Sequence, residues 1–291
     1  MPHIHVHAVQ PKTIRLLFIA FLINILLSLF EIGFGLYAQS VALIADALHN
    51  TSDAFSILIA IIAYKIGTKK ANERFSYGFK RAETIGSFVN LILLFISGIY
   101  LLYEGTVRLF VPEEINGAVI IWVSVLALLI DGLTAKLSHH DADHNMNMKM
   151  LFVHNLADAL GSVGVIVSGV FVVFLGWTFV DGLIALAIAV YMIAQAIFTF
   201  PQVVALLMNA TPSDMKICEI KEALLKIKGI CDVHHVHVWN IDEQEVALEC
   251  HIVGQDLKLV PKAKKILEER FGIHHCTIQM ETDKNCEACH L

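Results

Sequence analysis

A histidine and an aspartate stand four residues apart at two places in the chain, each time inside a strongly apolar stretch. The first pair, His49 and Asp53, lies in "ADALHNTSDAF", and the second, His154 and Asp158, lies in "FVHNLADALGS". Residues four apart share one face of a helix, so each imidazole lies over its carboxylate. Ionisable groups are costly in hydrocarbon and normally face the protein interior, where they carry a function. Two such helices brought together would supply two nitrogens and two carboxylate oxygens, a ligand set that suits tetrahedral Zn²⁺.

The alternative is that these polar pairs only hold two helices together. Two matched copies favour the metal site, because two carboxylates neutralise a divalent cation in an apolar environment. Imidazole combined with carboxylate favours Zn²⁺ over Mn²⁺ or Mg²⁺, whereas Co²⁺ and Cd²⁺ remain alternatives. Nearby Asp46 either orients the imidazole or attracts cations to the site, or it is merely structural.

The elements that must position these residues are long apolar helices. Of the 291 residues, 56% are apolar and only 16% are charged. The stretch "RLLFIAFLINILLSLF" has no polar face, unlike a helix of a soluble protein. We therefore expect an α-helical membrane protein with six transmembrane helices, at about 13–37, 41–66, 82–108, 117–137, 149–175 and 178–203.

The distribution of basic residues predicts the orientation of these helices. The connections near 38–41, 109–116 and 176–178 contain no lysine or arginine. Cytoplasmic loops carry an excess of basic residues, so both termini and the loops 67–81 and 138–148 are expected in the cytoplasm. A cell inner or plasma membrane is the expected location. The basic residues at the 67–81 loop are Lys65, Lys69, Lys70, Arg74, Lys80 and Arg81.

The last eighty or so residues have a different pattern. A helical periodicity near 214–228 is followed by two alternating segments, a second helix at 260–271 and the alternating "HHCTIQME". This order predicts a small α+β domain in the cytoplasm. We expect three regions: a histidine-containing segment at 1–12, the helical domain at 13–208 and the α+β domain at 209–291. Cytoplasmic cysteines favour metal ligation or packing over disulfides; the six are Cys218, Cys231, Cys250, Cys276, Cys286 and Cys289.

Several of these motifs together resemble the cation diffusion facilitator family, in its zinc-transporting branch. "SVALIADALHNTSD" and "HNLADALGS" are similar to the paired motifs of the family's second and fifth helices. "RFSYGFKRAETIGSFVN" resembles its basic loop, "WTFVDGLIAL" its entry into the sixth helix, and "VHHVHVWNI" its cytoplasmic domain. The resemblance implies a homodimeric antiporter that exchanges cytoplasmic Zn²⁺ for H⁺ by alternating access. It also implies a metallochaperone-like αββαβ cytoplasmic domain.

The resemblance further implies zinc ligation in that domain, in a structural or regulatory role. The terminal "NCEACH" adds a C-x-x-C spacing suited to thiolate ligands. Strand alternation leaves another interpretation open, because it places His234 and His274 on the same side as Val236, Val238 and Ile278, as core residues. The histidine-bearing segments 3–7 and 138–144 gather metal or serve as polar linkers. The expected ligands are His234, His251, His274, Glu281, Cys286 and Cys289.

Two other classes of protein fit the sequence less well. An intramembrane metalloenzyme keeps an open zinc position and a general base, but the chain has no H-E-x-x-H and its ligand set looks closed. A zinc-sensing receptor would need an output module. There is no Walker motif, so ATP is not the energy source. We expect no enzyme activity and no nucleic-acid partner; the expected partners are a second copy of the chain, Zn²⁺, H⁺ and the lipid bilayer.

Overall fold

The computed structural model describes residues 11–67, 69–111, 113–142, 146–242 and 245–282. These residues divide into two compact units, which are described separately. The membrane unit consists of the described residues of Met1–Ile62 and Val89–Phe200. The sheet unit consists of Ala63–Phe88 and the described residues of Pro201–Leu291.

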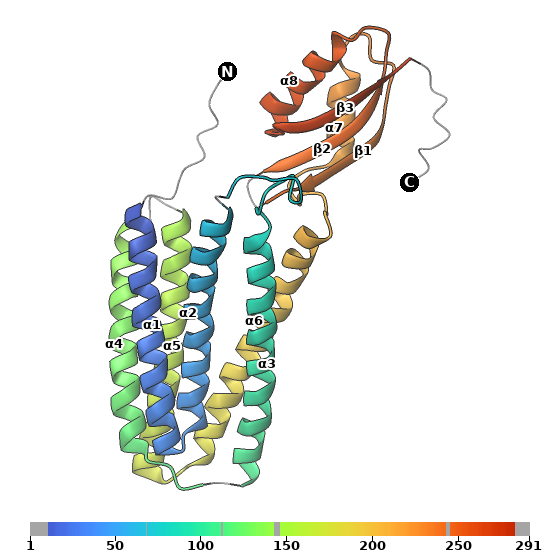
Figure 1. Ribbon diagram of the computed structural model, residues 1–291. Helices are drawn as coiled ribbons and strands as arrows, with labels where there is room; N and C mark the ends of the chain where they lie inside the picture. Colours follow the sequence, from blue (N-terminus) through green and yellow to red (C-terminus); the bar gives the residue numbers. More distant parts are fainter. Residues whose placement is uncertain (1–10, 68, 112, 143–145, 243–244, 283–291) are drawn as a thin grey trace. The chain divides into compact units, whose positions relative to one another are not determined.

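Long helices form the membrane unit and continue a short way into the sheet unit (Figure 1). Five helices in the described part of the chain are long and apolar enough to cross a membrane, and the described part of the fourth adds a shorter apolar helix, Gly117–Leu133. The six predicted helices are therefore confirmed. They are α1 (Pro11–Ala38), α2 (Val41–Gly67), α3 (Ala82–Phe110), α4 (Gly117–Ala142), α5 (Met146–Leu175) and α6 (Phe179–Leu207).

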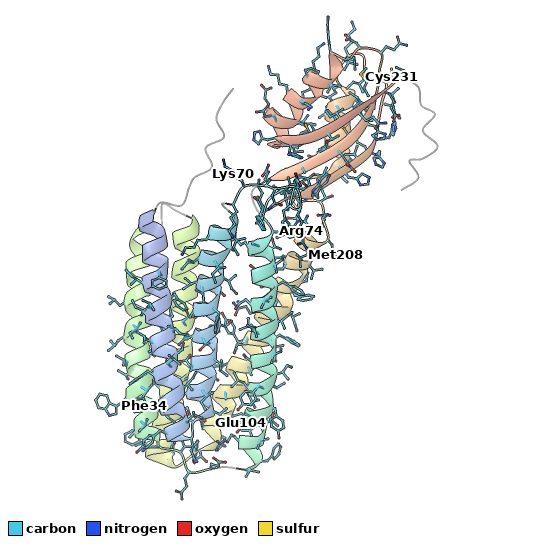
Figure 2. The ribbon with its side chains drawn as sticks, in the orientation of Figure 1. Phe34, Lys70, Arg74, Glu104, Met208 and Cys231 are labelled. Atoms are coloured by element: carbon cyan, nitrogen blue, oxygen red, sulfur yellow. The ribbon has the colours of Figure 1, made fainter. Side chains whose placement is uncertain are left out.

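The outer surface of these helices is apolar. Phe34 of α1 points away from the bundle (Figure 2), and Trp122 and Phe174 are 76% and 77% exposed. Inside, small residues of α2 such as Ala42 and Ala45 are fully buried, so neighbouring helices approach α2 closely. Large apolar side chains outside and polar ones inside are the arrangement that a lipid surround requires.

A buried carboxylate fixes the start of α2. Asp181 of α6 accepts hydrogen bonds from the backbone N–H groups of Val41 and Ala42, at 2.7 and 3.2 Å. The hydroxyls of Ser40 and Ser168 also donate to Asp181. The first N–H groups of a helix have no partner within the helix and carry its positive dipole end, so a carboxylate is a stabilising cap there. One side chain thus connects α2, α5 and α6.

The expected loop at 138–148 is largely helical, which corrects the prediction. Helix α4 continues to Ala142 and α5 begins at Met146. Polar residues are typical of a loop, but this stretch has no glycine or proline to stop a helix. Residues 143 and 144 of the histidine-bearing segment 138–144 lie outside the described residues, as does the N-terminal segment 3–7.

The sheet unit carries the αββαβ order that was predicted. Strand β2 pairs antiparallel with β1 and parallel with β3, so α8 forms the crossover between β2 and β3. Helices α7 and α8 cover one face of the sheet (Figure 1), where Leu224 and Leu267 join the buried residues of β2. The elements are α7 (Ile217–Leu225), β1 (Asp232–Asn240), β2 (Val246–Val253), α8 (Leu259–Phe271) and β3 (His275–Glu281).

A bulge in β1 changes which side chains face the helices. The pairing of β1 with β2 shifts between His234 and His237, and His235 has a positive φ of 49°. Val233 and Val236 are both buried although they are three residues apart, because the bulge inserts one extra residue. His234 therefore does not share the core side of Val236. The interpretation of His234 as a core residue, drawn from strict alternation, is wrong.

The connection between α2 and α3 packs within the sheet unit. Lys80 forms an ion pair with Glu245 and lies 3.9 Å from a carboxylate oxygen of Asp242. Arg81 donates a hydrogen bond to the side chain of Asn209, just beyond α6. Lys70 and Arg74 mark the same connection in Figure 2. Its aromatic residues line an apolar cavity of about 580 Å³ together with β1; the lining includes Phe75, Phe79, Ile85, Trp239 and Ile241.

Candidate metal centre

Helices α2 and α5 bring three of the four predicted membrane ligands together. Nε2 of His49 lies 3.6 Å from Oδ2 of Asp53, one turn further along α2. The same nitrogen lies 3.2 Å from Oδ1 of Asp158 on α5. The three residues form one group with ligand atoms close enough to bind a single ion.

These distances match those between ligand atoms around zinc. Zn–N and Zn–O bonds of about 2.0–2.2 Å at a tetrahedral angle place neighbouring ligand atoms about 3.3–3.6 Å apart. The observed separations from His49 are 3.2 and 3.6 Å. Helix α5 also contains position 154, one turn before Asp158, although the His154 side chain lies outside the described residues.

The group lies in the interior of the membrane unit. His49 and Asp158 are 5% and 8% exposed. The ring of Tyr191 on α6 meets the His49 ring edge-on, with their centroids 5.5 Å apart. Nδ1 of His49 is buried without a hydrogen-bond partner among the described residues. A site with two carboxylates and little solvent favours a cation strongly, because those charges cannot be neutralised by water.

A second polar cluster adjoins this group. The hydroxyl of Ser162 on α5 lies 3.2 Å from a carboxylate oxygen of Asp46 on α2 and 3.3 Å from one of Asp131 on α4. A Cβ at Gly161 would meet Asp46 at 3.3 Å, so a glycine permits this close approach of α5 to α2. Asp46 thus contacts Ser162, and no hydrogen bond from Asp46 to the His49 ring occurs among those of the described residues.

Sequence reasoning missed Ser162 because a serine in an apolar helix is unremarkable by itself. The signal that was available is position: Ser162 follows Asp158 by four residues and so lies on the same face of α5. Two further polar contacts connect the helices: Asn50 donates to the buried Glu31 of α1 at 3.1 Å, and Asn90 of α3 donates to Ser56 of α2 at 2.7 Å.

Three of the predicted cytoplasmic ligands also come together, on the sheet face away from α7 and α8. Nδ1 of His251 lies 2.8 Å from Oε1 of Glu281, and Nε2 of His234 lies 3.2 Å from Oε2 of Glu281. Both His234 ring nitrogens and Oε2 of Glu281 are buried without a hydrogen bond among the described residues. Buried polar atoms in that condition fit a bound metal, which would use them as ligands.

The remaining predicted ligands are not in this group. His274 is exposed just before β3, where Nδ1 lies 3.5 Å from Oε1 of Glu268. It is separated from Glu281 by the whole length of β3. Cys286 and Cys289 lie outside the described residues.

Of the four cysteines that the structure describes, two pack in or against the core and two have exposed thiols. Cys250 faces the core, and burial raises the pKa of its thiol to about 12. Burial also raises the pKa of Cys276, although Lys264 opposes that change. Cys218 and Cys231 are exposed. Because a thiol must lose its proton to bind zinc, the raised pKa values mark Cys250 and Cys276 as packing residues.

Comparison with known proteins identifies matches over nearly the whole chain. Residues 17–208 match the cation efflux transmembrane domain, and residues 212–283 match the cytoplasmic domain of cation efflux proteins. The cadmium, cobalt and zinc/H(+)-K(+) antiporter of Bacillus subtilis is 30% identical over 97% of this chain and 93% of its own length. The zinc transporter ZitB of Escherichia coli is 29% identical over 99% of this chain and 94% of its own length.

Among solved structures, the metal-bound C-terminal domain of the CzcD transporter from Cupriavidus metallidurans is 26% identical. The match covers 23% of this chain and 99% of the solved chain, with a TM-score of 0.22.

Proposed function

Because the chain belongs to the cation diffusion facilitator family, as its matches to both cation efflux domains show, we propose that it exports Zn²⁺ from the cytoplasm in exchange for protons. The protein is a membrane transporter of the zinc-transporting branch and not an enzyme. In this proposal the transport site is exposed alternately to the two sides of the membrane. The functional division falls near residue 209, with transport in 13–208 and metal binding and dimerisation in 209–291.

The observation that carries the proposal is the group formed by His49, Asp53 and Asp158. Its separations of 3.2 and 3.6 Å are those of ligand atoms around one tetrahedral zinc ion. We assign the fourth ligand to His154, one turn before Asp158 on α5. Two carboxylates balance the charge of the ion, which lets it occupy the interior of the membrane unit. Co²⁺ and Cd²⁺ suit the same ligands and are proposed as further substrates.

Proton coupling follows from the contact between His49 and Asp158. In the protonated site His49 is an imidazolium, and its Nε2–H donates to Oδ1 of Asp158 at 3.2 Å. A zinc ion needs the lone pair of Nε2, so it releases that proton, and the neutral ring keeps its other proton on Nδ1. Zinc thus leaves when protons arrive from outside, and the protonated site returns to the cytoplasmic side.

The direction of transport rests on the basic residues near the α2–α3 connection. Lysine and arginine are abundant there and absent from the connections near 38–41, 109–116 and 176–178. By the positive-inside tendency, we assign both termini and the sheet unit to the cytoplasm of a cell inner or plasma membrane. We also propose a homodimer, with zinc at His234, His251 and Glu281 in a structural or regulatory role.

Metal flux in proteoliposomes tests this function. The purified full-length protein is reconstituted with a zinc-sensitive dye inside the vesicles and an imposed pH gradient. We expect zinc to move opposite to the proton gradient, and a collapsed gradient to slow it. A K⁺ gradient is imposed separately, because the Bacillus subtilis relative is named for exchange of both H⁺ and K⁺. Flux that ignores both gradients would contradict antiport and indicate a passive channel.

A further inference from the structure

The uncovered face of the sheet carries a second group of metal-binding side chains. The ligand atoms of His235, His237 and Glu249 all lie within 4.8 Å of one another. His237 and Glu249 are direct partners across β1 and β2, so they project from the same face. This group shares no residue with the one formed by His234, His251 and Glu281.

The bulge in β1 places the new group on the same face as the first one. Residues two apart line one face of a regular strand, so His235 and His237 share a side, whereas His234 would face the helices. The pairing shifts between His234 and His237, and both therefore lie on the face of their β2 partners. His235 has a φ of 49° in this bulge, and its ring lies 4.6 Å from that of His237. A positive φ is uncommon outside glycine, and histidine is one of the types enriched there.

The carboxylates of the two groups differ in their partners. Glu281 lies 2.8 and 3.2 Å from two histidine nitrogens. The carboxylate of the half-buried Glu249, by contrast, has no ion pair or hydrogen bond within the part of the chain that the structure describes. Its negative charge lies beside two imidazoles that each offer a nitrogen lone pair when neutral. A divalent cation would satisfy all three side chains at once.

We propose that His235, His237 and Glu249 form a second cytoplasmic site for a divalent transition metal, with Zn²⁺ as the probe ion. Three protein ligands leave a fourth position for water, which the exposed edge of His237 allows. The two sites are neighbours: the ring of His251 lies 5.4 Å from that of His234 and 4.7 Å from that of His235. The open face of the sheet therefore binds two ions side by side.

The second site lies where the chain that leaves α6 is attached to β1. The hydroxyl of Thr211 donates to the backbone carbonyl of Val238, the residue after His237. A cavity of about 430 Å³ is lined by both His237 and Glu249 and by Asn209 and Thr211. An ion at this site would hold β1 to β2 next to that attachment. Binding of cytoplasmic zinc would therefore stiffen β1 where the chain segment that follows α6 is attached to it.

The number of zinc ions bound per protomer tests the second site. Full-length protein in detergent is dialysed against buffered free zinc, and bound metal is measured by atomic emission. Glu249→Gln and His237→Ala should each lose one zinc per protomer relative to the unsubstituted protein. The remaining ions should keep their affinity. Glu281→Gln should lose a different ion, so that Glu249→Gln/Glu281→Gln loses two.

Matched controls lie on the same unit. Glu269→Gln removes an exposed carboxylate of α8, and His275→Ala removes an exposed imidazole of β3; both should retain all bound zinc. Unchanged stoichiometry in Glu249→Gln and His237→Ala would overturn the proposal. The proposal would also be overturned if Glu249→Gln, Glu281→Gln and the double variant each lost only one zinc ion per protomer, because the two groups would then form a single shared site. The count is independent of flux, so a failure of zinc–proton exchange would leave this result intact.

Discussion

Nε2 of His49 and Oδ1 of Asp158 come from positions 109 residues apart and lie 3.2 Å from each other. This contact joins α2 to α5 at the proposed transport site, and it holds a proton where zinc would bind. In the proposed exchange, metal and proton compete for the same pair of atoms. Substitutions at this pair should change transport without disturbing the fold of the membrane unit.

Asp158→Ala and Asp53→Ala each remove an anionic ligand. We expect zinc flux in proteoliposomes to fall by at least about 100-fold, because even residues that only orient ligands change metal affinity by about 10–100-fold. Asp158→Asn keeps the shape and should fail equally, since the charge is needed. Asp214→Ala removes an exposed aspartate outside the membrane unit and serves as the control. Normal flux in a well-expressed Asp158→Ala variant would contradict the ligand assignment.

His49→Asp tests how the site selects its ion. The substitution replaces an imidazole nitrogen with a harder oxygen and adds a negative charge. We expect Mn²⁺ or Cd²⁺ to compete more strongly with Zn²⁺, because discrimination among divalent ions depends on ligand type. His49→Asn introduces an oxygen without the charge and separates the two effects. If competition assays give the same ion ranking for all three proteins, helix geometry and not ligand identity sets the preference.

The long helices and the order of the sheet unit were predictable because both depend on local periodicity. Asp53 and Asp158 were identifiable for the same reason, since a spacing of four residues is a local feature. The bulge at His235 was not, because it adds one residue to β1 and reverses the alternation beyond it. Contacts of Ser162 were also hidden, since a small polar residue acquires its role only when three helices meet around it.

Ser162→Ala should weaken both the fold and transport. Two buried carboxylates, Asp46 and Asp131, share the single hydroxyl donor of Ser162, and a lost donor of this kind costs about 1–3 kcal/mol. We expect a lower midpoint of thermal unfolding in detergent and slower zinc flux. Ser168→Ala is the matched control, because Asp181 keeps the hydroxyl of Ser40 and its two backbone donors. Equal effects of the two substitutions would mean that Ser162 has no particular role beside the transport site.

The thiol of Cys250 should be almost unreactive in the folded protein. Burial raises its pKa from 9.0 to about 12, so at pH 8 its thiolate fraction is about a thousandfold below that of an ordinary cysteine. Iodoacetamide should therefore label the exposed Cys231 and leave Cys250 unlabelled, as peptide mass spectrometry will show. Labelling of Cys250 within about tenfold of the Cys231 rate would contradict its placement in the core.

The same shift predicts how stability depends on pH. Below about pH 9, Cys250 is protonated in both the folded and the unfolded protein, so its thiol does not make the free energy of unfolding depend on pH. Between about pH 9 and 12 only the unfolded chain loses the proton, so the free energy of unfolding should fall as pH rises. Cys250→Ala should show a shallower decline than the unsubstituted protein in thermal unfolding across this range.

The cap that Asp181 places on α2 constrains how the transport site can change its exposure. Asp181 connects the first turn of α2 to α5 and α6 through buried hydrogen bonds, so these three helices cannot slide past one another at that end. His49 lies eight residues beyond Val41, about 12 Å along the axis of α2. A tilt of about 10° around the capped end would then carry His49 about 2 Å sideways. In the proposed exchange the cap is the pivot, and a swing of α2 by this angle would separate His49 from Asp158 and release the ion.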